Sequence, residues 1–189
     1  MKKIGIFLLA ALLLSVLLYA KELEGVTMPD QVTVGQTALV LNGMGLRIKK
    51  VAFISVKVYV AGLYLPKKSS DTSQILAADE PRQLVMHFLY KNVEKPKLVE
   101  GWTDGFKNNS SPNLEALKAR LEKFNGFWTD MKTGDKAVLT YIPGTGTKVE
   151  IKGKEMGVIE GKDFADALFS IWLGPKPPNE ELKKGLLGQ

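Results

Sequence analysis

The 189-residue chain contains no cysteine and a single histidine. Without cysteine it cannot form a disulfide framework, a thiolate zinc site, a cysteine nucleophile or a lipid-modified amino-terminal cysteine. His87 stands alone between Met86 and Phe88 with no acidic cluster nearby, which favours an ordinary strand histidine over a metal ligand. The nucleophile motif Gly-x-Ser-x-Gly is also missing. We therefore expect no metal site, no cofactor and no serine or cysteine hydrolase.

The charge is positive but scattered. Lys and Arg number 26 against 20 Asp and Glu, which gives a formal net charge of +6, yet no stretch concentrates the positive residues. A nucleic-acid partner is therefore not expected. With 45% hydrophobic residues and no repeat or low-complexity linker, residues 21–189 are expected to form a single domain.

The amino-terminal segment has the order of a secretory signal peptide. Met1-Lys2-Lys3 is basic, residues 4–20 are uncharged and apolar, and residues 21–24 are polar. Residues 1–20 are predicted to be removed, and the rest is predicted to be an exported, periplasmic, soluble protein that meets a membrane only during export. Because Leu18 is a poor residue for a cleavage site, an uncleaved anchor is the alternative.

Short apolar runs bounded by Gly or Pro predict the strands. These runs cover residues 31–41, 47–65, 82–89, 137–142, 147–152 and 155–159. Within 47–65, strict alternation would put Val56, Val58, Val60 and Tyr64 on one face and Tyr59, Ala61, Leu63 and Leu65 on the other. Both faces are apolar, so this strand is expected to be covered on both sides.

Helical spacing of apolar residues predicts the remaining elements. One helix follows Pro96, a second begins at Ser111-Pro112, a third covers about 161–173, and a short last one is capped by Asn179 and ends near Gly185. Strands first, helices in the middle, then a β meander and a helix are typical of an α+β fold in which helices cover an antiparallel sheet.

The most informative local segment contains Gly43-Met44-Gly45 and Arg47. It precedes a strand rather than a helix, so a phosphate loop is unfavoured and a glycine turn that leads into the strand is expected. Arg47 lies between Leu46 and Ile48 and needs an acceptor, either an internal carboxylate or a ligand. Tyr59, in an apolar strand, could add one hydroxyl donor. Guanidinium and phenol together suit a carboxylate, while a structural Arg and a core Tyr are the alternative.

These segments resemble the chalcone isomerase-like superfamily, in particular its exported bacterial members. The motif Gly-x-Gly-x-Arg at 43–47, the strand 58–65 that ends in Leu-Tyr-Leu, and segments 88–91, 159–162, 173–174 and 182–183 keep the family's order and spacing. The resemblance implies an open-faced β-sandwich, in which a large antiparallel sheet and a layer of helices enclose a ligand cleft. It also implies one of three roles: isomerase, fatty-acid binder or non-catalytic partner of other proteins.

Departures from the enzymes favour binding. The arginine that both isomerases and fatty-acid binders use matches Arg47, but the isomerases' strand threonine falls on Tyr59 and their Thr-Met pair on Ile171-Trp172. We expect a non-catalytic protein that binds a fatty acid or similar amphipathic carboxylate through Arg47 and Tyr59. An isomerase or lyase acting on an enone is one alternative, and a partner protein with a vestigial cleft, its Arg47 paired with an internal acid, is another. The apolar wall is expected from Val58, Leu98, Trp102, Leu117, Ile171 and Trp172.

Overall fold

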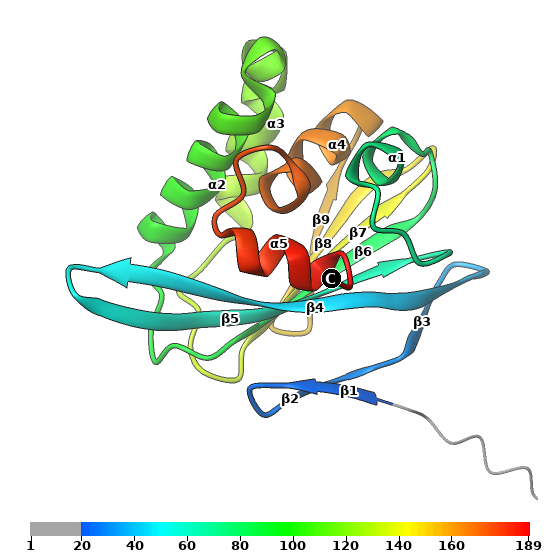
Figure 1. Ribbon diagram of the computed structural model, residues 1–189. Coiled ribbons are helices and arrows are strands. Elements are labelled where there is room, and N and C mark those ends of the chain that lie inside the picture. Colours follow the sequence, from blue (N-terminus) through cyan, green and yellow to red (C-terminus); the bar gives the residue numbers. More distant parts are fainter. Residues whose placement is uncertain (1–19) are drawn as a thin grey trace, which may run out of the picture.

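The computed structural model describes residues 20–189 (Figure 1), so the predicted signal peptide lies outside the described residues except for Ala20. A seven-stranded sheet has the order β3-β4-β5-β6-β7-β8-β9, and every neighbouring pair is antiparallel. Its strands are β3 (Gln31–Val34), β4 (Thr37–Val51), β5 (Ile54–Leu65), β6 (Arg82–Phe88), β7 (Lys136–Ile142), β8 (Gly146–Ile151) and β9 (Lys154–Ile159). A separate hairpin precedes them, made of β1 (Ala20–Leu23) and β2 (Val26–Pro29).

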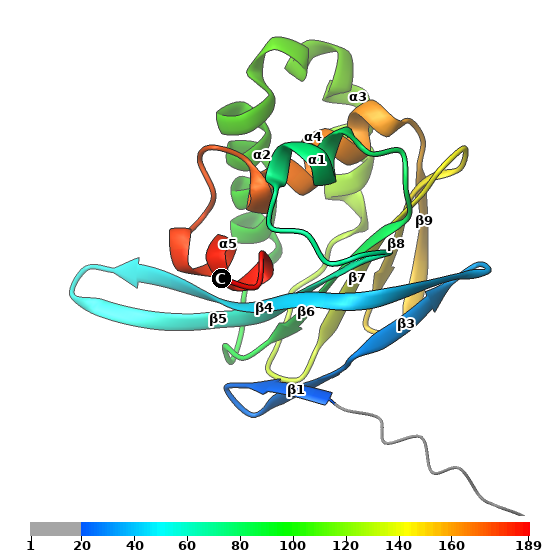
Figure 2. The same cartoon turned by 45° about the vertical axis from the view of Figure 1, so that its right-hand side comes forward.

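The helices lie together on one face of this sheet, and the β1–β2 hairpin lies on the other (Figures 1 and 2). They are α1 (Thr72–Ala77), α2 (Lys95–Ser110), α3 (Leu114–Phe127), α4 (Lys162–Leu173) and α5 (Glu180–Leu186), with a short 3-10 turn, η1 (Ser111–Asn113), between α2 and α3. The predicted α+β architecture, a large antiparallel sheet with a helix layer, is confirmed.

Two hydrophobic cores stabilise the sheet. The larger one, between sheet and helices, brings Trp102 within 5.0 Å of Trp128 and 5.5 Å of Trp172, measured between ring centroids. The smaller one, under the β1–β2 hairpin, includes Met28, Val60 and Tyr64. Strand β5 contributes to both cores, which agrees with the coverage on both sides predicted from its two apolar faces.

The predicted strand over 47–65 is wrong in one respect, because the chain reverses within it. Strand β4 ends at Val51, Ala52 and Phe53 form a two-residue turn, and β5 begins at Ile54. This turn contains no Gly, Asn or Pro, the residues that usually mark a hairpin turn in a sequence. The run 31–41 is also interrupted, by a turn at Gly35 with φ 59°. The β1–β2 hairpin and α1 were not predicted.

Gly43 and Gly45 do not form a turn either, since both lie inside β4. They face α5, which crosses directly over the strand. A Cβ atom on Gly43 would lie 2.8 Å from the Gly188 nitrogen and 2.9 Å from the Leu186 carbonyl oxygen, and one on Gly45 would lie 2.9 Å from Leu182 Cδ1. Glycine is therefore required for close approach of helix and strand backbones.

Candidate functional site

A cavity of about 700 Å³ lies beside the β4–β5 hairpin. The two strands form one wall, α2 forms the facing wall, and the segment after α4 closes one side. Apolar side chains line much of the wall, and charged residues of β4 and α2 lie among them. The apolar lining residues are Val51, Val56, Val58, Val93, Leu98, Trp102, Ile171, Pro177 and Pro178; the charged ones are Arg47, Lys49, Lys50, Glu94, Lys97, Glu100, Asp104 and Lys176.

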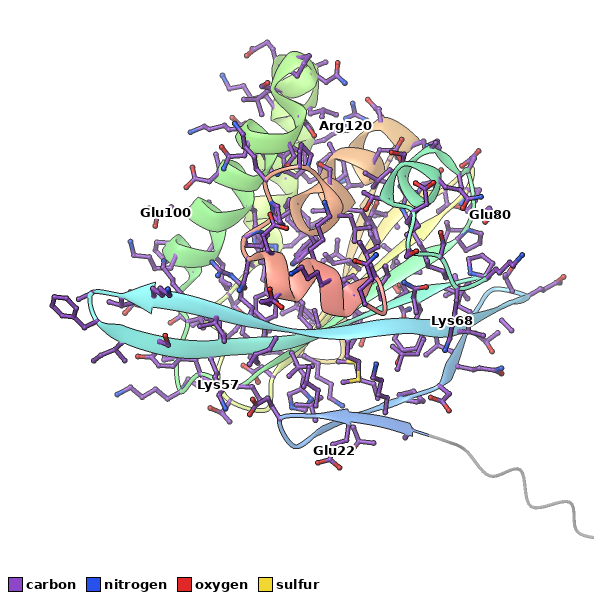
Figure 3. The ribbon with its side chains drawn as sticks, in the orientation of Figure 1. Glu22, Lys57, Lys68, Glu80, Glu100 and Arg120 are labelled. Atoms are coloured by element: carbon purple, nitrogen blue, oxygen red, sulfur yellow. The ribbon has the colours of Figure 1, made fainter. Side chains whose placement is uncertain are left out.

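A β-bulge shapes the strand wall of the cavity. Arg47 pairs with Tyr59 and Ile48 pairs with Lys57, so Val58 is an extra residue on β5. Directly paired residues share a face, and an extra residue reverses the alternation that follows it. Val56 and Val58 therefore line the cavity with Arg47 and Tyr59, which corrects the expectation that they share a face with Val60 and Tyr64. On the opposite face, Lys57 reaches toward the β1–β2 hairpin (Figure 3) and pairs with Glu24 at 2.6 Å.

Arg47 brings a positive charge to the cavity and has no ion-pair partner within residues 20–189. Its guanidinium donates to the carbonyl oxygen of Ile48 and, at 3.4 Å, to Oδ1 of Asn179. Both acceptors are neutral, and Arg47 forms no ion pair with any residue in 20–189, whereas Arg82 and Arg120 each pair with an aspartate. The internal acid that a purely structural Arg47 would require is thus not found in the described part of the chain. A charge in this setting is available to an anion.

Asn179 explains how the last helix positions this arginine. Asn179 precedes α5 as predicted, but its side chain makes no capping hydrogen bond to that helix. Its Oδ1 instead accepts from the backbone nitrogen of Ile48 at 3.2 Å and from Arg47. The residue that the sequence assigned to a helix cap therefore ties the start of α5 to the cavity wall.

Tyr59 offers a buried, neutral donor next to Arg47. Its ring is 3% exposed, and its phenolic oxygen accepts a hydrogen bond of 3.0 Å from Nε1 of Trp172. Burial raises the pKa of Tyr59 above its usual 10.0, although the Trp172 hydrogen bond and the positive charge of Arg47 act in the opposite direction. The hydroxyl therefore stays protonated at neutral pH, and its proton has no acceptor among residues 20–189.

The structure distributes the other predicted wall residues between cavity and core. Val58, Leu98, Trp102 and Ile171 line the cavity. Leu117 and Trp172 do not: Leu117 is fully buried in α3, which packs on α2 and β9, and Trp172 is 1% exposed behind Tyr59. The spacing of apolar residues identifies the buried face of a helix but not the neighbour that covers this face. For this reason the sequence placed Leu117 and Trp172 at the cavity, although both are buried in the core.

Sequence reasoning missed the charged residues around the cavity. Lys49 comes from β4, and Lys97 and Glu100 come from α2, where they pair with each other at 2.9 Å. Exposed charged residues on a helix or a strand form no sequence pattern that indicates a binding site. Only their position in the folded protein shows that these residues lie at the cavity.

His87 lies elsewhere in the sheet, paired with Val60 and Lys136. Within residues 20–189 no group of His, Cys, Asp or Glu could hold a metal ion, and no helix is long and apolar enough to cross a bilayer.

Comparison with known proteins agrees with this architecture. No curated protein matches the sequence. Among solved structures, the crystal structure of an Arabidopsis thaliana fatty-acid binding protein matches with a TM-score of 0.71, at 17% identity over 89% of this chain and 96% of that chain. This likeness shows a shared fold. The family model described as chalcone isomerase-like matches residues 20–188. Since that match spans nearly the whole chain, the protein belongs to the chalcone isomerase-like family.

Proposed function

We propose that this protein binds a fatty acid or a similar amphipathic carboxylate in the cavity beside the β4–β5 hairpin, without transforming it. The observation that carries the proposal is the pairing of Arg47 and Tyr59 on one face of two adjacent strands. One residue supplies a positive charge with no acid partner in residues 20–189, and the other supplies a proton with no acceptor there. A carboxylate satisfies both at once, because it accepts hydrogen bonds from two donors and carries the opposite charge.

The apolar lining supports a hydrocarbon tail. From Arg47 the cavity follows the hairpin past Val58 and Val56, with Leu98 of α2 on the facing wall. In the proposed orientation the carboxylate binds at Arg47 and the tail extends toward the end of the hairpin. The Arabidopsis thaliana protein of the same fold is a fatty-acid binding protein, which is consistent with this ligand class.

We favour binding over isomerase or lyase chemistry because the isomerases' strand threonine corresponds here to Tyr59 and their Thr-Met pair to Ile171-Trp172. A general base needs a pKa near the working pH, and burial moves the pKa of this phenol away from that range. The proposal includes the export predicted from residues 1–20, which places the binding outside the cytoplasm.

A displacement assay with a fluorescent fatty acid tests the proposal. We expect Arg47→Ala to weaken binding about 10- to 100-fold, because a charged hydrogen bond contributes about 1.5–3 kcal/mol. Arg120→Ala is the matched control, since it removes the same side chain from α3, where Arg120 pairs with Asp163. Equal affinity of the Arg47→Ala, Arg120→Ala and unaltered proteins would overturn the proposal.

Native mass spectrometry of the purified protein provides a second readout. A bound fatty acid that is present in the unaltered protein and absent from Arg47→Ala would support carboxylate binding at this residue. A ligand-free mass together with no displacement would instead favour the partner-protein alternative. Turnover of an enone by the unaltered protein would favour the enzyme alternative.

A further inference from the structure

The turn between β4 and β5 exposes an unusual apolar surface. Val51 is 54% exposed, Ile54 68% and Phe53 104%, and these are three of the four large hydrophobic residues exposed within residues 20–189. We call Val51–Ile54 the hairpin tip. In both views the tip projects beyond the helix layer (Figures 1 and 2). Exposed apolar groups gathered at one point mark an interaction site more often than scattered ones do.

The backbone of the tip is also unfavourable for its sequence. Ala52 has φ 53°, a left-handed conformation in which glycine is normally preferred. A Gly or Asn would ease the turn, yet the chain has Ala followed by Phe. The tip therefore presents an aromatic side chain to solvent on a turn that is not optimised for folding.

The charges beside the tip indicate which partner it fits. Residues 49–57 contain three lysines and no acid. Lys57 pairs with Glu24, but Lys49 and Lys50 form no ion pair within residues 20–189. The acids that line the cavity are Glu94, Glu100 and Asp104; none of them forms an ion pair with Lys49 or Lys50, and Glu100 (Figure 3) is paired with Lys97. An apolar point flanked by unpaired lysines matches the interface of a bilayer that contains anionic lipid.

We propose that the hairpin tip docks the protein onto an anionic lipid surface, with Phe53 and Ile54 in the interface and Lys49 and Lys50 at the headgroups. The same hairpin forms the cavity wall, because Val51 and Val56 line the cavity. Arg47 and Val51 are four residues apart, roughly 13 Å along a strand. Docking therefore brings to the membrane the end of the cavity that holds the hydrocarbon tail in the proposed orientation. This role in ligand exchange rests on the proposed function, whereas the docking itself does not.

Vesicle flotation tests the docking without any fatty acid. The protein as purified after export, with the same amino terminus in every variant, is mixed with phosphatidylcholine vesicles with or without phosphatidylglycerol. We expect Phe53→Ser to reduce binding about tenfold or more, the loss expected for one buried aromatic side chain. Lys49→Gln combined with Lys50→Gln should reduce binding to the anionic vesicles only. The control pair Lys107→Gln with Lys118→Gln, exposed lysines of α2 and α3, should bind as the unaltered protein does.

The outcomes separate docking from ligand binding. Vesicle binding that is equal for Phe53→Ser and the unaltered protein would overturn the proposal, and so would self-association through the tip without vesicle binding. Phe53 is outside the cavity lining, so the Phe53→Ser variant should bind fluorescent fatty acid in solution as tightly as the unaltered protein does. It should, however, transfer the bound fatty acid to vesicles more slowly. Tip-dependent vesicle binding by a protein that binds no fatty acid would support docking and refute the proposed function.

Discussion

Trp172 donates a hydrogen bond of 3.0 Å from its indole nitrogen to the phenolic oxygen of Tyr59, joining α4 to β5. Trp172 is buried and does not line the cavity, so its effect on a ligand is exerted through Tyr59. Because the phenolic oxygen already accepts this bond, the hydroxyl proton is left to point elsewhere. Trp172 is thus a positioning residue for the proposed donor.

Replacing Trp172 by Phe should weaken fatty-acid binding about fivefold, the effect of one neutral hydrogen bond. Trp128→Phe is a matched control, because the Trp128 nitrogen is buried without a hydrogen-bond partner. A double-mutant cycle measured by fluorescent displacement separates positioning from packing: in a Tyr59→Phe background, Trp172→Phe should have little further effect on affinity. An undiminished effect in that background would contradict the positioning role.

Alanine at Gly45 should destabilise the protein by about 1–3 kcal/mol, the usual penalty for overpacking. A methyl group there meets Leu182 of α5, and displacement of α5 also shifts Asn179 away from Arg47. Chemical denaturation measures the loss, and displacement should show weaker binding by the folded variant. Gly126→Ala is the control: this α3 position has open space around it, so Ala should stabilise by about 0.5–1 kcal/mol. Similar effects at both positions would refute the close-approach explanation.

Arg82→Met should cost about 3 kcal/mol of unfolding free energy, the lower range for breaking a buried pair. Arg82 is 1% exposed, pairs with Asp166, and donates to the Ile75 carbonyl oxygen at 3.0 Å, so it joins β6 to α1 and α4. Asp166 keeps Lys162 at 2.6 Å, which limits the loss. Arg120→Ala removes a more exposed pair and should cost less than about 1 kcal/mol. Comparable losses measured by urea denaturation would contradict the special role of Arg82.

His87 should make stability depend on pH near neutrality. Burial and the neighbouring Lys136 lower the pKa of His87 from 6.5, so the folded state binds its proton less strongly than the unfolded chain does. The contribution of neutral His87 is fully present above pH 6.5 and is lost as the pH falls below that value. Urea denaturation across this window should show a shallower pH dependence for His87→Gln. Carboxylates such as Asp135, whose pKa is lowered from 3.8, titrate at lower pH, so they do not affect the comparison between His87→Gln and the unaltered protein.

Local pattern was enough to identify most elements. The stripe Leu98, Trp102 and Phe106 is buried in α2, and the predicted terminal meander corresponds to β7, β8 and β9. The sequence also selected Arg47 and Tyr59, which the structure pairs across β4 and β5 at the cavity. Their role as ligand contacts stays a prediction. Side-chain periodicity carries this information because it reflects which face of an element meets the core.

What the sequence determined is the type and order of the elements, the apolar faces of β5, and two candidate residues for a carboxylate. Tertiary structure alone decided the turn at Ala52–Phe53, the bulge at Val58, the approach of α5 to Gly45, and the exclusion of Trp172 from the cavity lining. Each of these depends on contacts between segments far apart in the chain. A local pattern shows that a residue is buried, but only the packed fold determines what it is buried against.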